Sequence, residues 1–153
     1  RLKRVPYLEG GYPITGDDLN DAAAQADVTV EPGDIVLVRT GHMHHLPHDR
    51  DRYAHPSPGL STRAIPWIHD HDIAAVATDT LVFEVFPCED PNVLLPVHMI
   101  QLRDMGLLQG QNWYLDALAA DCTSDRRWTF QLVASPLPLT HSVGGPVAPV
   151  AIK

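Results

Sequence analysis

The sequence is poor in cysteine and in positive charge, and each shortage argues against certain kinds of site or partner. Only Cys88 and Cys122 occur among 153 residues, without a CxxC spacing, so neither a disulfide framework nor a cysteine-based zinc site is predicted. There are 11 Lys and Arg against 19 Asp and Glu, which gives a net charge of −8. This balance argues against nucleic acid and anionic membrane as partners. The cytoplasm is the expected location, because unpaired cysteines are typical of reducing surroundings.

Long apolar runs and the common catalytic motifs are also missing. No stretch approaches the roughly 18–20 apolar residues of a membrane span. The patterns GxGxxG, GxxxxGK[ST], GxSxG and HExxH do not occur, so nucleotide binding, a serine-hydrolase elbow and a zincin site are not supported. The remaining composition, 44% hydrophobic and 20% charged, is ordinary for a globular chain with one core.

Hydrophobic patterning alternates helices with strands, which is typical of an α/β fold. Thr15 and Asp18 form a capping box before a helix at 17–26. Two strands, at 34–40 and 73–79, are apolar enough to be buried. The other predicted elements are helices at 61–68, 96–106 and 114–122, a strand at 127–135 and a short C-terminal strand. We expect one domain with a mixed sheet.

Histidine is concentrated in one segment, GHMHHLPHDRDRYAH at 41–55. Five of the nine histidines lie there: His42, His44, His45, His48 and His55. Neutral imidazole is a good ligand of zinc or manganese, but this spacing matches no known ligand pattern. A solvated polar loop and a metal site are both open interpretations. His42 stands apart, because it follows a predicted strand at the end where α/β sheets place functional groups.

Three further residues are candidates for chemistry. His98 lies near the start of the helix at 96–106, with Leu94, Leu95 and Leu102 within about one turn, so either a packed core histidine or a ligand fits the pattern. Asp79 ends the second apolar strand and Glu84 follows five residues later. A carboxylate at such a strand end is typical of a loop cap or of a site residue.

Five segments in the order found here resemble the cyclase family of metal-dependent hydrolases, which includes bacterial kynurenine formamidases and isatin hydrolases. The resemblance extends from about Leu8 to Lys153. The segments are PGDIVLVRTG (32–41), PSPGL (56–60), AAVATDT (74–80), Val97–His98 with MGLLQGQNWYLDALAADC (105–122), and PLPLTHSVGGPVAPVAIK (136–153).

The resemblance implies a swivelling β/β/α-type domain that binds zinc or manganese and assembles into homo-oligomers. The family's HxGTHxD-type metal motif has no match here and lies upstream in the family. Residues 1–153 are therefore expected to form the C-terminal half of such a domain, with the upstream half of the same protein as its partner. The resemblance also argues against a metal site in the segment 41–55, because the family's metal ligands lie elsewhere in the chain.

The resemblance further implies roles for single residues. His98 matches the family's downstream ligand histidine, and Gln111 stands where a glutamate usually precedes an asparagine. A neutral amide does not offset the repulsion between two cations, so one divalent ion at most is expected. The other candidates are His42, Asp79 and Glu84, near the metal or the substrate, and Tyr53, Trp67 and Trp113, which could stack on an aromatic substrate or belong to the core.

Three functions remain open from the sequence. The first is hydrolysis of a C–N amide bond, in a formamide or a cyclic amide, of a small substrate. The second is cyclisation or lactone chemistry at the same kind of activated carbonyl. The third is a non-catalytic structural or binding half that lacks the upstream metal motif.

Overall fold

The computed structural model describes residues 2–153 of the chain. These residues form two compact units, one reaching to Ala117 and the other spanning Leu118–Lys153. Within the part of the chain that the structure describes, no helix is long and apolar enough to cross a membrane. The predicted α/β class is confirmed at the level of helices combined with parallel and antiparallel strands.

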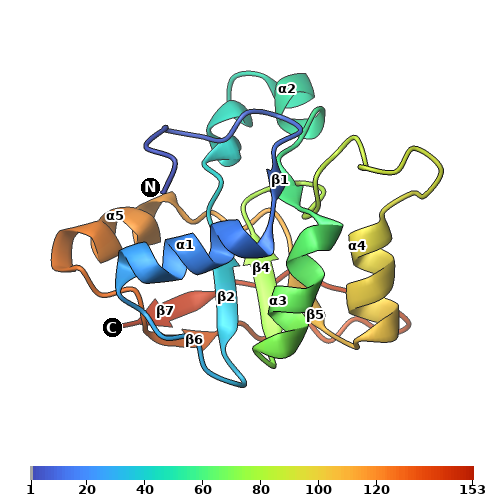
Figure 1. The fold of residues 1–153 in the computed structure, drawn as a ribbon. Helices are drawn as coiled ribbons and strands as arrows, with labels where there is room; N and C mark the ends of the chain where they lie inside the picture. The colour runs from blue at the N-terminus through green and yellow to red at the C-terminus, as the bar shows by residue number, and fades with distance from the viewer. Residues whose placement is uncertain (1) are drawn as a thin grey trace. The chain divides into compact units, whose positions relative to one another are not determined.

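A three-stranded parallel sheet forms the centre of the first unit (Figure 1). Its strands are β2 (Ile35–Val38), β4 (Ala75–Thr78) and β5 (Leu108–Gly110), in the order β2-β4-β5. Ile35 pairs with Ala75, and Ala75 pairs with Leu108. Because parallel strands all end at one edge of the sheet, the residues that follow these three strands gather at that edge.

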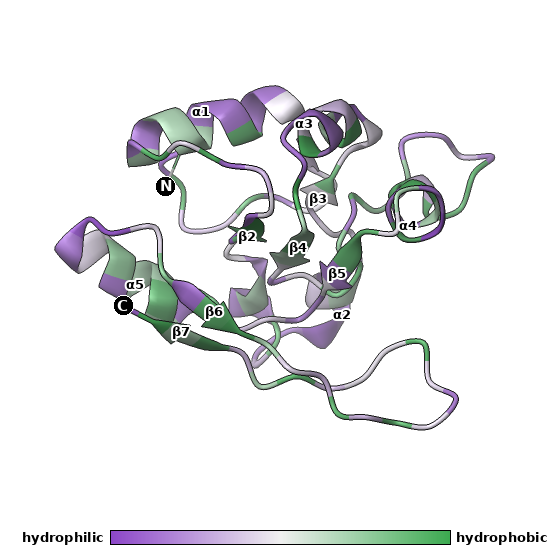
Figure 2. Ribbon diagram, turned by 90° about the horizontal axis from the view of Figure 1, so that it is seen from below, coloured by the Kyte–Doolittle hydropathy of each residue, from purple (hydrophilic) through white to green (hydrophobic). Residues whose placement is uncertain are grey.

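Two helices cover one face of this sheet. They are α1 (Gly16–Ala26) and α3 (Ile65–Asp70), which lie side by side in Figure 1 and in Figure 2. The capping box predicted for the start of α1 is present. Leu19 of α1, Ile68 of α3 and Val76 of β4 belong to one buried core cluster, so the predicted helices and the burial of β4 are confirmed. The burial predicted for β2 is wrong, since β2 is an edge strand and Ile35 is exposed.

The histidine-rich segment is more ordered than the predicted loop. It contains a 3-10 helix η1 (His42–His45) and a short helix α2 (Arg50–Ala54). Beyond it, β3 (Gly59–Leu60) pairs in parallel with β1 (Pro13–Ile14). The turn η2 (Thr62–Ala64), capped by Ser61 as predicted, then leads into α3.

The helix predicted at 96–106 is present and has an unexpected form. It begins as α4 (Pro96–His98) and continues as the π-helical η3 (Met99–Asp104). Gly106 then ends it with a φ of +67°, a conformation that glycine adopts without strain. Strand β5 follows at once and was not predicted, because three residues are too few to show a periodic pattern.

The second unit contains most of α5 (Asp116–Asp125) and a two-stranded sheet. Strand β6 (Gln131–Val133) pairs antiparallel with β7 (Val150–Ile152). Lys153 forms ion pairs with Asp121 and Asp125. Parallel and antiparallel strands lie in separate sheets among the described residues, so the single mixed sheet expected from the sequence is not found there. The assignment of residues 1–153 to one domain half stays a prediction.

Candidate functional site

Glu84 fastens the start of helix α4. Its carboxylate is 1% exposed and accepts hydrogen bonds from the backbone N–H groups of Val97 at 3.1 Å and His98 at 2.9 Å. These N–H groups belong to the first turn of the helix and have no partner within it. A negative charge is also favoured at this end of a helix. Glu84 therefore satisfies two orphan donors while remaining out of water.

Gly59 allows Glu84 to reach this position. A Cβ at Gly59 would lie 2.3 Å from the Glu84 carbonyl carbon and 2.5 Å from the Phe83 carbonyl oxygen. Any side chain there would push the backbone of residues 83–84 away from strand β3. Glycine is required here for the close approach of two backbone segments.

His98 is held at both ring nitrogens. Its Nδ1 lies 2.6 Å from Glu84 Oε1, and its Nε2 lies 2.8 Å from Gln111 Nε2. A carboxylate only accepts hydrogen bonds, so Nδ1 donates to Glu84, and the Gln111 amide, as placed, donates to Nε2. The Phe83 ring packs edge-on against the imidazole. A carboxylate behind Nδ1 is the arrangement that orients a histidine for metal ligation through Nε2.

The apolar surroundings expected for His98 are provided by Phe83 and not by the leucines Leu94 and Leu102. Leu94 is 71% exposed and Leu102 is 48% exposed, so neither covers the imidazole. The helical spacing suggested contacts along α4, whereas the actual polar partners come from residues 84 and 111. The side chain of His98 is 17% exposed, which leaves it within reach of a small ligand.

Gln111 follows β5 in a segment pinned to strand β4. The backbone N–H of Asn112 donates to the Thr80 carbonyl at 3.0 Å, and that of Trp113 donates to the Thr78 carbonyl at 3.1 Å. Gly110 permits the turn, because a Cβ there would lie 2.8 Å from the Trp113 indole. Trp113 is half-buried and lies next to Gln111 in the chain, so it remains a candidate for substrate contact.

Asp79 clamps the turn that follows β2. Its carboxylate accepts from the Thr40 N–H at 2.8 Å, the Thr40 hydroxyl at 2.7 Å and the Gly41 N–H at 2.8 Å. Burial raises the pKa of this carboxyl, and the hydrogen bonds from Thr40 and Gly41 oppose the rise. With three donors already bound, Asp79 is placed to hold the turn rather than to exchange protons with a substrate.

Tyr53 links the histidine-rich segment to the residue beside Gln111. Its hydroxyl donates to Asn112 Oδ1 at 2.6 Å and lies 3.3 Å from the Asp79 carbonyl oxygen. Burial, and secondarily the charge of Asp79, raises the pKa of Tyr53 to about 12. The phenol is 3% exposed, so its ring offers no free face for the substrate stacking suggested from the sequence. The link between Tyr53 and Asn112 was missed, since nothing in the sequence pairs Asn112 with a residue so distant.

The interpretation of residues 41–55 as a solvated loop is wrong for two of its histidines. His42 is 1% and His45 is 7% exposed, with their rings 5.1 Å apart. His42 Nε2 donates to the Arg52 carbonyl, while His42 Nδ1 and His45 Nε2 have no hydrogen-bond partner. Burial lowers the pKa of both rings. Among residues 2–153, no three or more His, Cys, Asp or Glu side chains are arranged to hold a metal ion.

Trp67 lies in the core, away from the residues just described. It is buried between α1 and α3, its indole N–H donates to Asn20 Oδ1 at 2.6 Å, and His71 stacks on its ring. A Cβ at Gly16 would lie 3.0 Å from the Trp67 Cβ, so α1 approaches it closely. These contacts account for the side chain without a substrate.

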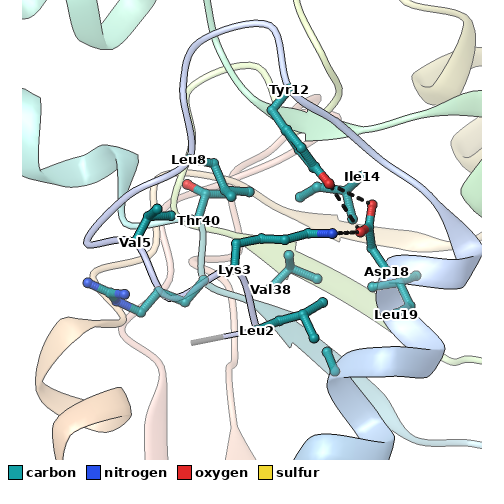
Figure 3. Close-up of a pocket in the computed structure, with 12 residues that line it drawn as sticks. Leu2, Lys3, Val5, Leu8, Tyr12, Ile14, Asp18, Leu19, Val38 and Thr40 are labelled. Carbon is teal, nitrogen blue, oxygen red and sulfur yellow. Dashed lines mark hydrogen bonds and ion pairs between the residues drawn. The ribbon is translucent and has the colours of Figure 1, made fainter.

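A small pocket of about 100 Å³ lies elsewhere in the first unit (Figure 3). Apolar side chains from residues 2–8, α1 and β2 line most of it. At one end Lys3 pairs with Asp18 at 2.5 Å, and the Tyr12 hydroxyl donates to the same carboxylate. None of the candidate site residues named from the sequence lines this pocket, and Glu84, His98 and Gln111 are not among its lining residues.

The chain matches one family model and several solved structures. The model of the Cyclase family matches residues 3–85. The crystal structure of a novel cyclase is 37% identical, with a TM-score of 0.90 over 100% of this chain and 51% of its own. An isatin hydrolase bound to the product analogue thioisatinate is 20% identical, with a TM-score of 0.73 over 94% of this chain and 53% of its own.

A second isatin hydrolase, isatin hydrolase A from Ralstonia solanacearum, gives the same identity and TM-score over 94% of this chain and 54% of its own. At 20% identity these two enzymes share the fold with this chain. None of the curated proteins matches it. The chain spans about half the length of the solved structures that it resembles.

Proposed function

The chain belongs to the cyclase family, and from that premise we propose that the full-length protein is a metal-dependent hydrolase of a C–N amide bond in a small substrate. The observation that carries this proposal is the Glu84–His98–Gln111 cluster. It orients the His98 imidazole through Nδ1 and places Nε2 beside an amide that can also offer oxygen. The fold shared with two isatin hydrolases supports a hydrolytic reaction at a ring amide.

The donor set fits part of a site for one divalent ion. His98 Nε2 and, after rotation of its amide, Gln111 Oε1 would hold zinc or manganese, and the remaining ligands would come from the upstream half of the protein. When bound, such an ion supplies Lewis acidity that polarises a carbonyl and acidifies water. Gln111 is neutral, so the pair carries no charge to offset a second cation. The proposal is therefore one ion in each site.

Glu84 and Trp113 have separate tasks in this site. Glu84 accepts a hydrogen bond from Nδ1 of His98 and so orients the ring with Nε2 toward the proposed ion. Trp113 is half-buried beside Gln111 and is the best placed of the three aromatic candidates to contact an aromatic substrate. His42 and Asp79 lie around the turn after β2 and do not contact His98 or Gln111. They would support the shape of the site rather than move protons. Assembly into homo-oligomers is part of the same proposal.

A second candidate function is closure or opening of a lactone ring. The relative that is 37% identical over the whole chain is described as a cyclase, which favours this chemistry. The same residues would serve, because an ester carbonyl is activated in the same manner as an amide carbonyl. The difference lies in whether water or an internal hydroxyl attacks, and in which leaving group accepts the proton.

The test uses the full-length protein and compares two histidine variants. His98→Ala removes the proposed ligand, while His69→Ala removes an exposed histidine on α3 whose ring contacts its neighbour Asp70. We expect His98→Ala to weaken Mn²⁺ or Zn²⁺ binding by 10-fold or more, measured by competition titration, and His69→Ala to leave it unchanged. Equal affinities in wild type and His98→Ala would remove His98 from the ligand set and overturn the proposal.

Substrate class is tested with the metal-loaded wild-type protein. An N-formyl arylamine, a cyclic amide such as an indole-2,3-dione, and an aryl lactone would be compared by following the loss of each carbonyl compound. Turnover of the amides that His98→Ala abolishes supports the hydrolase. Turnover of the lactone alone favours the second candidate. Metal binding without turnover of any of the three would favour a non-catalytic role.

A further inference from the structure

We propose that Tyr53 is a positioning residue, whose phenol acts through Asn112 to fix the direction of Gln111 toward His98. The inference rests on the proposed function, since it concerns the site assigned there. It gives the histidine-rich segment a task that its histidines do not reveal. Tyr53 comes from that segment, whereas Asn112 lies 59 residues further along the chain.

The Tyr53 side chain is held from both ends. Its backbone lies in α2, whose start is capped by the Asp49 carboxylate, which accepts from the Arg52 N–H at 2.9 Å. Its ring stacks on His42 at 5.9 Å between centroids, with 27° between the planes. With 3% of the residue exposed, the hydroxyl has one fixed location at the end of a rigid ring.

The hydroxyl proton is directed mainly at Asn112. A phenol has one proton to donate, and the 2.6 Å contact with Asn112 Oδ1 is much shorter than the 3.3 Å contact with the Asp79 carbonyl. Because the pKa of Tyr53 is raised to about 12, the phenol stays protonated at any pH at which an enzyme is assayed. The phenol therefore keeps the proton that it donates to Asn112.

Asn112 passes this constraint to Gln111 through the backbone. Asn112 has a φ of +59°, a left-handed conformation that asparagine tolerates better than most residues. Its N–H donates to Thr80 on one side, and the next N–H, that of Trp113, donates to Thr78. The Tyr53 hydroxyl fixes the side chain as well, so the peptide between residues 111 and 112 has little freedom left.

Such fixation matters because Gln111 has a long side chain. A glutamine holds three rotatable bonds, and its amide must meet His98 Nε2, at 2.8 Å here. A shift of its backbone by a few tenths of an ångström would change that contact. Groups that bind a metal or substrate need to be held to within about 0.5 Å by residues that are themselves locked. Tyr53 and Asn112 supply this support from outside the site.

The test removes the hydroxyl alone, in the full-length protein. Tyr53→Phe keeps the ring that stacks on His42, and Tyr12→Phe is the matched control, since the Tyr12 hydroxyl also donates to a partner, Asp18, at 3.1 Å. We expect Mn²⁺ to bind Tyr53→Phe about 10-fold more weakly than wild type, the lower end for residues behind a ligand. Tyr12→Phe should remain within 2-fold of wild type.

A double variant shows whether Asn112 transmits the effect. Asn112→Gly removes the acceptor and tolerates the positive φ. If the two residues act through one hydrogen bond, Tyr53→Phe combined with Asn112→Gly binds Mn²⁺ no more weakly than Asn112→Gly alone. Losses that simply add would show that the hydroxyl acts through another partner, and would overturn the inference.

A second readout works without metal. In the metal-free protein, the ¹⁵N signals of the His98 ring and the side-chain amide of Gln111 should shift in Tyr53→Phe and stay in place in Tyr12→Phe. A purely structural role would lower the melting temperature of both variants without moving these signals. Unchanged signals together with unchanged Mn²⁺ affinity in Tyr53→Phe would overturn the inference and leave the proposed function intact.

The two proposals fail in different ways. If His98→Ala binds Mn²⁺ as well as wild type, the proposed function fails, and the metal-free signals alone decide whether Tyr53 orients Gln111. If His98→Ala weakens binding while Tyr53→Phe behaves as Tyr12→Phe in both measurements, the inference about Tyr53 fails by itself.

Discussion

Histidine 98 and the pair His42–His45 show two ways in which a folded chain treats an imidazole. His98 is half-buried, and each of its ring nitrogens has a polar partner that fixes the proton on one side. His42 and His45 are more deeply buried, and one nitrogen of each ring has no partner. The lone histidine is the oriented one, while the crowded ones mainly pack. Partners, and not the number of histidines nearby, therefore mark the candidate site.

The largest effect is expected from removing the partner of His98. Glu84→Ala leaves the N–H groups of Val97 and His98 buried without acceptors, and each unsatisfied donor costs about 1–3 kcal/mol. We expect the free energy of unfolding to fall by about 3 kcal/mol, measured by urea denaturation of the full-length protein. Glu84→Gln keeps one acceptor oxygen, whereas Val97 and His98 donate to different oxygens, so it should lose at least half as much. A Glu84→Ala protein as stable as wild type would show that the carboxylate does not fasten α4.

An intermediate effect is expected where the histidine pair is anchored. Gly41 has a φ of +78°, and a Cβ there would lie 2.3 Å from the Pro6 carbonyl oxygen. Gly41→Ala should lower the free energy of unfolding by about 2 kcal/mol or more, since left-handed strain alone costs about 1–2 kcal/mol. Gly33→Ala is the control, because Gly33 has a φ of +90° and its Cβ would meet no described atom within 4 Å. Equal losses in the two variants would mean that the contact with Pro6 adds nothing.

The smallest effect is expected in the pH dependence of stability, to which the buried pair His42–His45 contributes. Burial lowers the pKa of His45 below the usual 6.5, so the unfolded chain takes up a proton first as the pH falls. The stability that the neutral ring contributes is complete above about pH 6.5 and declines below it, down to the folded pKa. His45→Phe should flatten the fall in melting temperature between pH 7 and pH 5.

His44→Phe is the matched control for that measurement, since His44 is exposed in the same 3-10 helix. We expect it to leave the pH dependence of the melting temperature as in wild type. The buried carboxyl of Asp79, whose pKa is raised, acts in the opposite sense and gains stability as the pH falls, so only the difference between the two variants is diagnostic. Identical curves for both variants would place the pH dependence elsewhere in the protein.

The sequence predicted the elements with strong local signals. Neighbouring residues alone predict the capping box at Thr15, the apolar strand β4 and the helix that starts at Pro96. All three are present. Strands β1, β3 and β5 have two or three residues each. They exist because of pairing with distant segments, which no local pattern encodes. The same reason explains why the antiparallel pair β6–β7 was expected to share a sheet with the others.

The candidate site was foreseen in part. His98, Gln111 and Glu84 were named from the sequence, and the structure brings these three together. Their mutual geometry was not foreseen, because the position of Glu84 depends on the close approach of its backbone to Gly59 of β3, and that of Gln111 follows a strand too short to predict. Asn112 was noted only as the asparagine after Gln111, and its contact with Tyr53 was not foreseen because the two residues are remote in sequence. The roles proposed for these side chains stay predictions until metal binding is measured.

The carboxylate of Glu84 has a consequence for entropy. It binds the backbone of His98 and the ring of the same residue at once, so the two side-chain torsions of this histidine are frozen together with the first turn of the helix. A long or rotamer-rich side chain ordered during binding costs about 0.5–1.5 kcal/mol. For His98 that loss of freedom occurs when the chain folds. A ligand that binds later at Nε2 therefore does not have to order the ring.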